Sequence, residues 1–140
     1  MKLTLHHIGI LVNDIAKQAS VYQDRFGYEP VTGIINDPEQ TAWVQFVGIT
    51  EDNVYLEFVS PDSPESKLSN LLSKGEGLHH LCYATDTIEE SCANLRNTGM
   101  TLIRPPVSAT AFGGRRIAWL RGRDGVLIEL VERGRQGEKL

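Results

Sequence analysis

An internal repeat constrains the fold more than any other feature of the sequence, because two copies of one unit are expected to form the same structure. The segment Leu5–Ile8 (Leu-His-His-Ile) returns as Leu78–Leu81 (Leu-His-His-Leu), 73 residues later. The segment Val54–Val59 returns as Val126–Val131, 72 residues later. The nearly constant offset indicates a tandem of two half-domains that differ by one inserted or deleted residue.

The pattern in each half predicts a βαβββ module. One module is expected over residues 3–60 and the other over residues 76–133. Runs rich in Val, Ile and Leu predict the strands. In the first module we expect strands over residues 3–12, 28–35, 41–49 and 54–59. In the second module we expect strands over residues 78–84, 100–104, 116–121 and 125–131.

One helix is expected after the first strand of each module. Asp14 suits the N-cap of the first helix, and Gly27 suits its C-terminal end, where a positive φ is needed. Thr87 begins a capping-box pattern that predicts the start of the second helix. A short linker helix is expected over residues 63–75. The chain is therefore expected to be one α+β domain over residues 1–140.

The alternation of side chains along the strands predicts a polar group on one face of each module. In the last strand of the first module the even-numbered positions are apolar, so this face packs against the helix and Glu57 points to the other face. The last strand of the second module repeats this pattern around Glu129. His7 and His80 likewise lie opposite the apolar positions of their strands. If the two free faces combine into a cup, it receives two imidazoles and two carboxylates.

These four side chains form a candidate metal site. Any one of them alone would more often be a solvated side chain on an open sheet face, but both residue types recur in both modules in the same order and on the same face. Imidazole nitrogens and carboxylate oxygens suit Zn²⁺, Co²⁺, Ni²⁺, Mn²⁺ or Fe²⁺. Four protein ligands leave two positions of an octahedral ion open to water or substrate oxygens, as catalysis requires. The predicted ligands are His7, Glu57, His80 and Glu129.

Other side chains are candidates for contact with a substrate. Gln45 lies in a predicted strand of the first module, although its amide cannot take up a proton and act as a base. Arg115 and Arg116 belong to a stretch, residues 104–123, that contains five arginines. These arginines could bind a phosphate or carboxylate, although a solvated surface cluster is an equal alternative. Cys82 shares the face of His80, where a small buried thiol is the favoured interpretation.

Composition excludes several classes of protein. Lys+Arg 14 against Asp+Glu 18 gives a net charge of −4, which argues against a nucleic-acid-binding protein. No apolar run reaches the ~20 residues of a membrane span, and the first residues do not resemble a signal peptide. Two cysteines are too few for a disulfide scaffold. We expect a cytoplasmic protein that binds neither nucleic acid nor a membrane.

The paired βαβββ pattern, the strand starts at His7 and His80, and the strand ends around Glu57 and Glu129 resemble the vicinal oxygen chelate superfamily. The resemblance covers about residues 4–132 and is greatest to the methylmalonyl-CoA epimerases. It implies a cup-shaped mixed sheet with the helices outside and a divalent metal ion on the same four ligands. It also implies a homodimer with an acyl-CoA thioester or a glutathione adduct as substrate.

The resemblance implies metal-assisted proton transfer at the carbon next to a carbonyl, with Glu129 or Glu57 as the base. Return of the proton to the opposite face of that carbon gives epimerisation, and return to the neighbouring carbon gives the lyase reaction of glyoxalase I, which is the first alternative. An extradiol dioxygenase is disfavoured because it uses only three protein ligands. A metal-free binding or resistance protein of the same fold is the alternative from another class.

Overall fold

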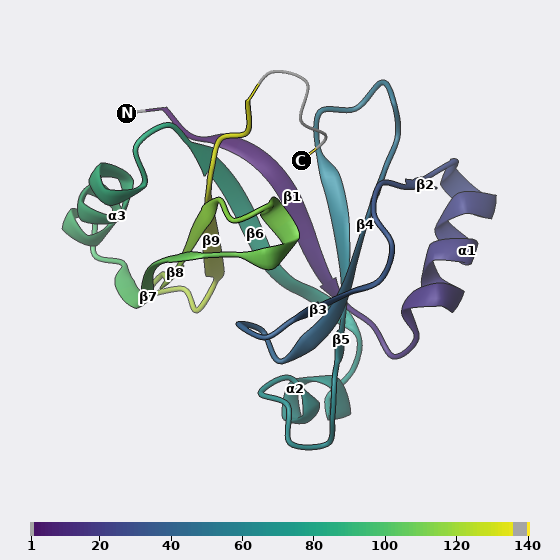
Figure 1. Cartoon of the computed structure of the whole chain (residues 1–140). Helices are drawn as coiled ribbons and strands as arrows, with labels where there is room; N and C mark the ends of the chain where they lie inside the picture. Colours follow the sequence, from purple (N-terminus) through teal and green to yellow (C-terminus); the bar gives the residue numbers. More distant parts are fainter. Residues whose placement is uncertain (1, 136–139) are drawn as a thin grey trace. The chain divides into compact units, whose positions relative to one another are not determined.

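The computed structural model describes residues 2–135 and 140, and it divides into two compact units. The first unit comprises residues 7–79. The second unit comprises the residues up to His6 together with those from His80 onward. The elements drawn in Figure 1 are, in chain order, β1 (Thr4–Leu11), α1 (Ile15–Phe26), β2 (Glu29–Pro30), β3 (Ile35–Asp37), β4 (Ala42–Gly48), β5 (Tyr55–Pro61), α2 (Ser69–Ser73), β6 (Gly77–Thr85), α3 (Ile88–Asn97), β7 (Thr101–Ser108), the 3₁₀ helix η1 (Thr110–Phe112), β8 (Arg116–Arg121) and β9 (Leu127–Glu132).

In the first unit the strand order is β2-β4-β5-β1, and β3 also pairs with β4. Strands β1 and β5 are parallel, whereas β4 is antiparallel to β5. Helix α1 begins after Asp14, whose carboxylate accepts a hydrogen bond from the Lys17 N–H at 3.1 Å. It ends at Gly27, which has a φ of 84°. Both predicted ends of this helix are confirmed.

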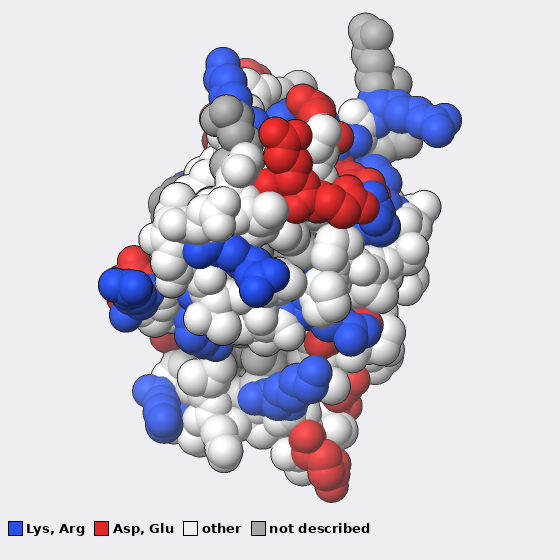
Figure 2. Space-filling view, turned by 90° about the vertical axis from the view of Figure 1, so that its left-hand side faces the viewer, with Lys and Arg blue, Asp and Glu red and all other residues white. Residues whose placement is uncertain are grey.

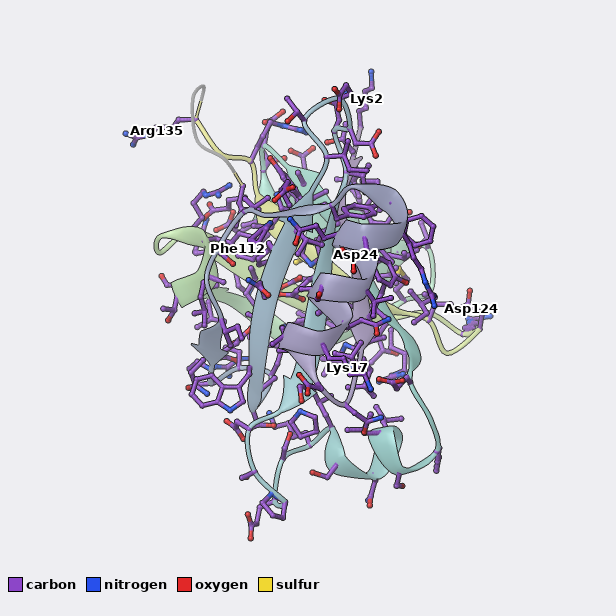
Figure 3. The ribbon with its side chains drawn as sticks, turned by 90° about the vertical axis from the view of Figure 1, so that its right-hand side faces the viewer. Lys2, Lys17, Asp24, Phe112, Asp124 and Arg135 are labelled. Carbon is purple, nitrogen blue, oxygen red and sulfur yellow. The ribbon has the colours of Figure 1, made fainter. Side chains whose placement is uncertain are left out.

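Apolar side chains cover both faces of the first sheet. On one face, under α1 (Figure 3), a cluster contains Val12, Ile15, Val47, Leu56 and Phe58. The opposite face carries a second cluster, which contains Leu11, Ala42, Val44, Val59 and Leu68. Leu68 immediately precedes α2. The surface of α1 that carries Lys17 and Asp24 is exposed. The helix therefore contributes its apolar side to one layer of the core and its polar side to the surface.

The second unit has the strand order β6-β9-β8-β7. Strands β6 and β9 are parallel, and β8 is antiparallel to both β9 and β7. Helix α3 packs on this sheet through a cluster of Ile88, Cys92, Ala118, Leu120 and Leu130. The predicted α+β class with two modules of one β-strand, one helix and further β-strands is confirmed.

Several predicted boundaries are wrong. The single strand expected over residues 28–35 is two short strands, β2 and β3, because the N–H groups of Val31 and Thr32 both donate to the carbonyl of Phe46 and the chain turns there. The linker helix begins at Ser69 rather than at residue 63, because the hydroxyl of Ser66 donates to the carbonyl of Thr41 and holds the preceding residues in turns.

In the second unit, β7 extends to Ser108 instead of ending at residue 104. Val126 precedes β9 and is 36% exposed, so it does not pack under α3 as the alternation predicted. Thr87 is the N-cap of α3, but its side chain makes no capping hydrogen bond. The Thr85 hydroxyl instead accepts from the Thr87 N–H and bonds to the Ser91 hydroxyl at 2.6 Å. Among the described helices, none is both long enough and apolar enough to cross a membrane.

Candidate metal-binding site

The first unit brings its predicted histidine and glutamate together. His7 lies on β1 and Glu57 on β5, and their side chains are 0% and 2% exposed. Nε2 of His7 is 3.6 Å from Oε1 of Glu57. Gly9 lies directly beside Glu57 in the β1–β5 ladder.

The second unit repeats this pair. His80 lies on β6 and Glu129 on β9, and both side chains are almost completely buried. Nε2 of His80 is 3.4 Å from Oε1 of Glu129. Cys82 occupies the position that corresponds to Gly9, beside Glu129 in the β6–β9 ladder, and it is fully buried.

Each histidine ring also contacts one aromatic side chain edge to face. The rings of His7 and Phe46 have centroids 5.0 Å apart and an interplanar angle of 85°. Those of His80 and Trp119 are 4.9 Å apart at 80°. Each unit therefore contains a histidine, a glutamate and an aromatic side chain in the same arrangement.

The geometry of each pair suits two ligands of one divalent ion. Two atoms that each lie about 2.1 Å from an ion are about 3.0 Å apart at a right angle and about 3.4 Å apart at the tetrahedral angle. The observed separations of 3.6 Å and 3.4 Å are close to the second value. They are longer than the ~2.7–2.9 Å of a charge-assisted N–H···O hydrogen bond. The donor set in each unit therefore fits an ion of the zinc class.

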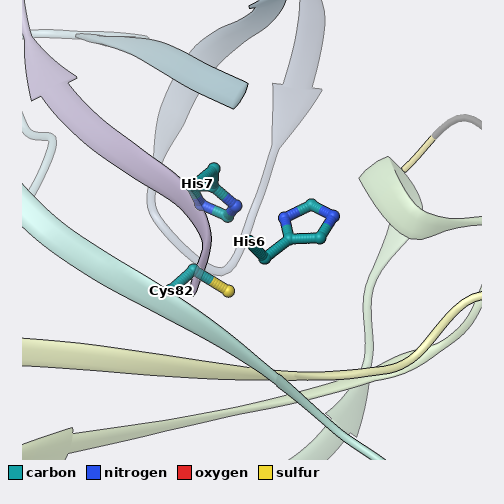
Figure 4. A group of neighbouring side chains, drawn as sticks. All are labelled: His6, His7 and Cys82. Carbon is teal, nitrogen blue, oxygen red and sulfur yellow. The ribbon is translucent and has the colours of Figure 1, made fainter. Parts of the chain in front are cut away.

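His6 and Cys82 are a further group of possible ligands in the second unit, and the sequence interpretation did not select His6. Their ligand atoms lie within 4.8 Å of one another, and Figure 4 draws both side chains. The ring of His6 also packs edge to face on Phe112, with centroids 5.6 Å apart. The repeated His-His dipeptide was the available signal, but the strand alternation pointed only to its second member.

Gln45, predicted to contact a substrate, lies on the other face of the first sheet from Glu57. It is directly opposite Phe58 in the β4–β5 ladder, and opposed residues present their side chains on the same face. Phe58 belongs to the cluster under α1. The Gln45 amide donates to the carbonyl of Thr32 at 3.0 Å. The structure therefore does not bring Gln45 together with Glu57.

Arg116 is part of an ion-pair network within the second unit. Its guanidinium contacts Glu89 on α3 and Glu132 on β9, the latter at 3.0 Å. These hydrogen bonds raise the pKa of Arg116, most of all the one to Glu132. The same contacts lower the pKa values of the two carboxyls. This arginine, predicted to bind a substrate, connects three elements of its own chain.

Arg115 has different surroundings. Its guanidinium donates to the main-chain oxygens of Phe112, Glu132 and Leu140. It lines a cavity of about 510 Å³ together with Arg133 and Arg135. The acidic lining residues of this cavity are Asp86, which pairs with Arg133 at 2.9 Å, and Glu132, which pairs with Arg116. Three arginines therefore line this cavity, and one of them, Arg133, is itself the ion-pair partner of the lining carboxylate Asp86.

The face of the molecule drawn in Figure 2 carries charged side chains of both signs. On the face drawn in Figure 2, Lys and Arg side chains are scattered and are accompanied by groups of Asp and Glu side chains. On this face the basic side chains do not form a continuous stripe.

Comparison with known proteins identifies the family. Residues 6–132 match the model of the Glyoxalase/Bleomycin resistance protein/Dioxygenase superfamily. The chain belongs to this superfamily, which is also called the vicinal oxygen chelate superfamily.

Its relatives include epimerases. The chain is 28% identical over 132 residues to the mitochondrial methylmalonyl-CoA epimerase of Mus musculus, covering 91% of this chain and 72% of that protein. It is 32% identical over 135 residues to the uncharacterized protein YqjC of Bacillus subtilis (strain 168), covering 91% of both. A Streptomyces coelicolor methylmalonyl-CoA epimerase variant, in complex with 2-nitronate-propionyl-CoA, has a TM-score of 0.82 at 30% identity, covering 96% of this chain and all of that one. A hypothetical protein from Bacillus halodurans C-125 has a TM-score of 0.84 at 29% identity, covering 99% and 100% of the two chains.

Proposed function

We propose that this protein is a divalent-metal-dependent enzyme that transfers a proton at the carbon next to the thioester carbonyl of an acyl-CoA, as a methylmalonyl-CoA epimerase does. The observation that carries the proposal is the buried histidine–glutamate pair that recurs in both units. The relation to methylmalonyl-CoA epimerases supports an acyl-CoA thioester as the class of substrate.

The four pair residues, His7, Glu57, His80 and Glu129, would hold the ion. A bound divalent ion polarises the carbonyl and stabilises the negative charge that develops when the neighbouring carbon loses its proton. The side chains of all four residues are at most 4% exposed. Their burial keeps water away from the reacting carbon and strengthens electrostatic interactions there.

The proton acceptor in this proposal is Glu57 or Glu129. On the face of the first sheet that carries Glu57, β4 contributes the apolar side chains of Val44 and Phe46. On the corresponding face of the second sheet, β8 contributes Ile117 and Trp119 beside Glu129. Among the described residues of β4 and β8, none adds a carboxylate, an imidazole or a thiol to these faces. We assign the role of proton acceptor to the carboxylates of the pairs rather than to the neighbouring Cys82 thiol.

The cavity lined by Arg115, Arg133 and Arg135 supports an anionic substrate. Guanidinium groups bind phosphate through paired N–H donors, and coenzyme A carries three phosphates. The three main-chain oxygens that accept from Arg115 fix its orientation before a ligand arrives. We assign the phosphates of the substrate to this cavity.

Isotope exchange tests the proposed reaction. The protein, loaded with Co²⁺ or Zn²⁺, is incubated with methylmalonyl-CoA in D₂O, and deuterium at the α-carbon is followed by mass spectrometry and NMR. We expect exchange that depends on the ion, and a loss of about 10²–10³-fold in rate for Glu129→Gln, comparable to the loss of one transition-state charge stabiliser. Full activity of Glu129→Gln would exclude this residue as the base.

The same preparation separates the alternatives. Absence of exchange, with lactoylglutathione formed from methylglyoxal and glutathione, would identify a glyoxalase I activity instead. Elemental analysis of protein purified without added metal tests the metal-free binding protein. Near-zero metal content and no response to added ion would favour that class over both enzymes.

A further inference from the structure

We infer that Phe46 and Trp119 are positioning residues of the metal site, one in each unit, which fix the rings of His7 and His80. The inference rests on the proposed function, because a ligand needs a fixed orientation only if it binds an ion. It assigns a role to two side chains that the sequence pattern did not select.

The strand ladders place each aromatic residue with its pair. Phe46 on β4 is directly opposite Glu57, and Trp119 on β8 is directly opposite Glu129. Opposed side chains in an antiparallel ladder share a face. Each aromatic ring therefore lies on the same face as the glutamate of its unit, and each contacts the histidine at close to a right angle.

The contact restricts the one torsion that decides which atom the imidazole presents. Rotation about χ2 of a histidine is broad and roughly two-fold, so that an unrestrained ring can turn Nε2 away from the glutamate. In each unit the aromatic side chain fills the space beside the ring, and Phe46 and Trp119 are only 0% and 7% exposed. The ring is held while Nε2 lies 3.6 Å or 3.4 Å from the carboxylate.

The effect of removing one aromatic ring follows from the strength of the contact. Edge-to-face aromatic pairs contribute beyond their buried area by an amount that corresponds to about 2- to 12-fold in an equilibrium constant. Loss of a hydrogen-bonded group that orients a metal-bound histidine typically costs about 10- to 100-fold in metal affinity, and we expect a packed ring to act at the lower end of that range. We therefore expect Phe46→Leu and Trp119→Leu each to weaken binding of Co²⁺ by about tenfold.

Calorimetric titration of the chelator-treated protein with Co²⁺ tests this expectation. Trp119→Phe retains a ring at the same place and is expected to keep the affinity within about threefold of the wild type, whereas Trp119→Leu loses about tenfold. Trp43→Leu is the matched control, because Trp43 is 44% exposed and lies opposite Ser60, on the other face of β4 from Phe46. Circular dichroism and thermal melting establish that each variant is folded.

Fluorescence gives a second measurement, in which the two histidines and two glutamates of the site all remain in place. The chain has two tryptophans, so Trp43→Phe leaves only Trp119 as a fluorophore and Trp119→Phe leaves only Trp43. Co²⁺ quenches a nearby indole. We expect saturable quenching in Trp43→Phe, with the same dissociation constant as in calorimetry, and none in Trp119→Phe.

The outcomes distinguish the inference from the proposed function. A wild-type protein that takes up no Co²⁺ would overturn the metal site itself. Binding by the wild type that is equally tight in Phe46→Leu and Trp119→Leu would overturn the positioning role and leave the metal site intact. Quenching of Trp43 instead of Trp119 would place the ion away from His80 and would also overturn the inference.

Discussion

A bound divalent ion should raise the melting temperature of this protein by several degrees. The perturbation is the addition of Co²⁺ or Zn²⁺ to chelator-treated protein. A ligand that binds only the folded state, present at about 100 times its dissociation constant, stabilises that state by about 2.7 kcal/mol. The unfolding entropy is about 2.1 cal/mol/K per residue. For a chain of 140 residues, the free energy of unfolding therefore changes by about 0.29 kcal/mol per kelvin near the melting temperature. The expected rise is therefore about 9 °C.

Replacing one buried carboxylate should lower the melting temperature of the ion-loaded protein without lowering that of the ion-free protein. Without an ion, the buried Glu129 costs desolvation energy, so Glu129→Gln is expected to melt at the same temperature as the wild type or higher. With the ion, the variant lacks one ligand and should gain less. The structure predicts this difference because the Glu129 side chain is only 4% exposed and lies 3.4 Å from His80.

Differential scanning calorimetry with and without the ion measures both effects. Glu51→Gln is the matched control, since Glu51 lies in an exposed turn of the first unit and its substitution should leave the ion-dependent rise unchanged. If the wild type showed no rise, the metal site would be refuted. If Glu129→Gln rose as much as the wild type, the ion would bind at other residues.

Three further predictions concern the core, an ion pair and the arginine cavity. Phe58 is fully buried and its ring lies 5.1 Å from Tyr22, so Phe58→Ala should lower the free energy of unfolding by about 3–5 kcal/mol; a urea titration showing less than 1 kcal/mol would contradict the packing described. The pKa of Glu132 lies below its ordinary value of 4.5, chiefly because the Arg116 side chain donates to it. Its stabilising contribution is thus complete above pH 4.5 and lost as the pH falls through the lowered pKa. The difference in urea midpoint between wild type and Glu132→Gln should therefore be largest near pH 7 and should shrink in acid. Arg115→Ala should raise KM for a CoA thioester about tenfold, by the loss of one charged hydrogen bond, and leave KM for the N-acetylcysteamine thioester unchanged; an equal rise for both substrates would place the phosphates elsewhere.

The sequence predicts the local features of this fold well because they depend on short-range spacing. The ends of α1 follow from Asp14 and from Gly27, whose φ of 84° favours glycine. The failures occur where contacts distant in sequence decide the structure. The linker helix starts late because Ser66 bonds to Thr41, 25 residues away, and no local pattern signals that bond.

The candidate site divides in the same way. The alternation of side chains along a strand has a period of two residues, so the sequence alone assigns each histidine and glutamate to a face. Register between strands is a tertiary property. It places Phe46 opposite Glu57, and it places Gln45 on the face that does not carry Glu57. Arg116 could be recognised as a cation, but its ion pairs with Glu89 and Glu132 join three separate elements.

The sequence by itself therefore determined the duplicated βαβββ order and the identity of the two histidine–glutamate pairs, because repeats and alternation are written along the chain. Only the tertiary structure decided that each histidine nitrogen lies within 3.6 Å of the glutamate oxygen of its pair. It also decided which aromatic ring contacts each histidine and that Arg115 lines the cavity with Arg133 and Arg135. Those outcomes depend on which strands and helices become neighbours, and that is set by packing of the whole unit rather than by any short segment.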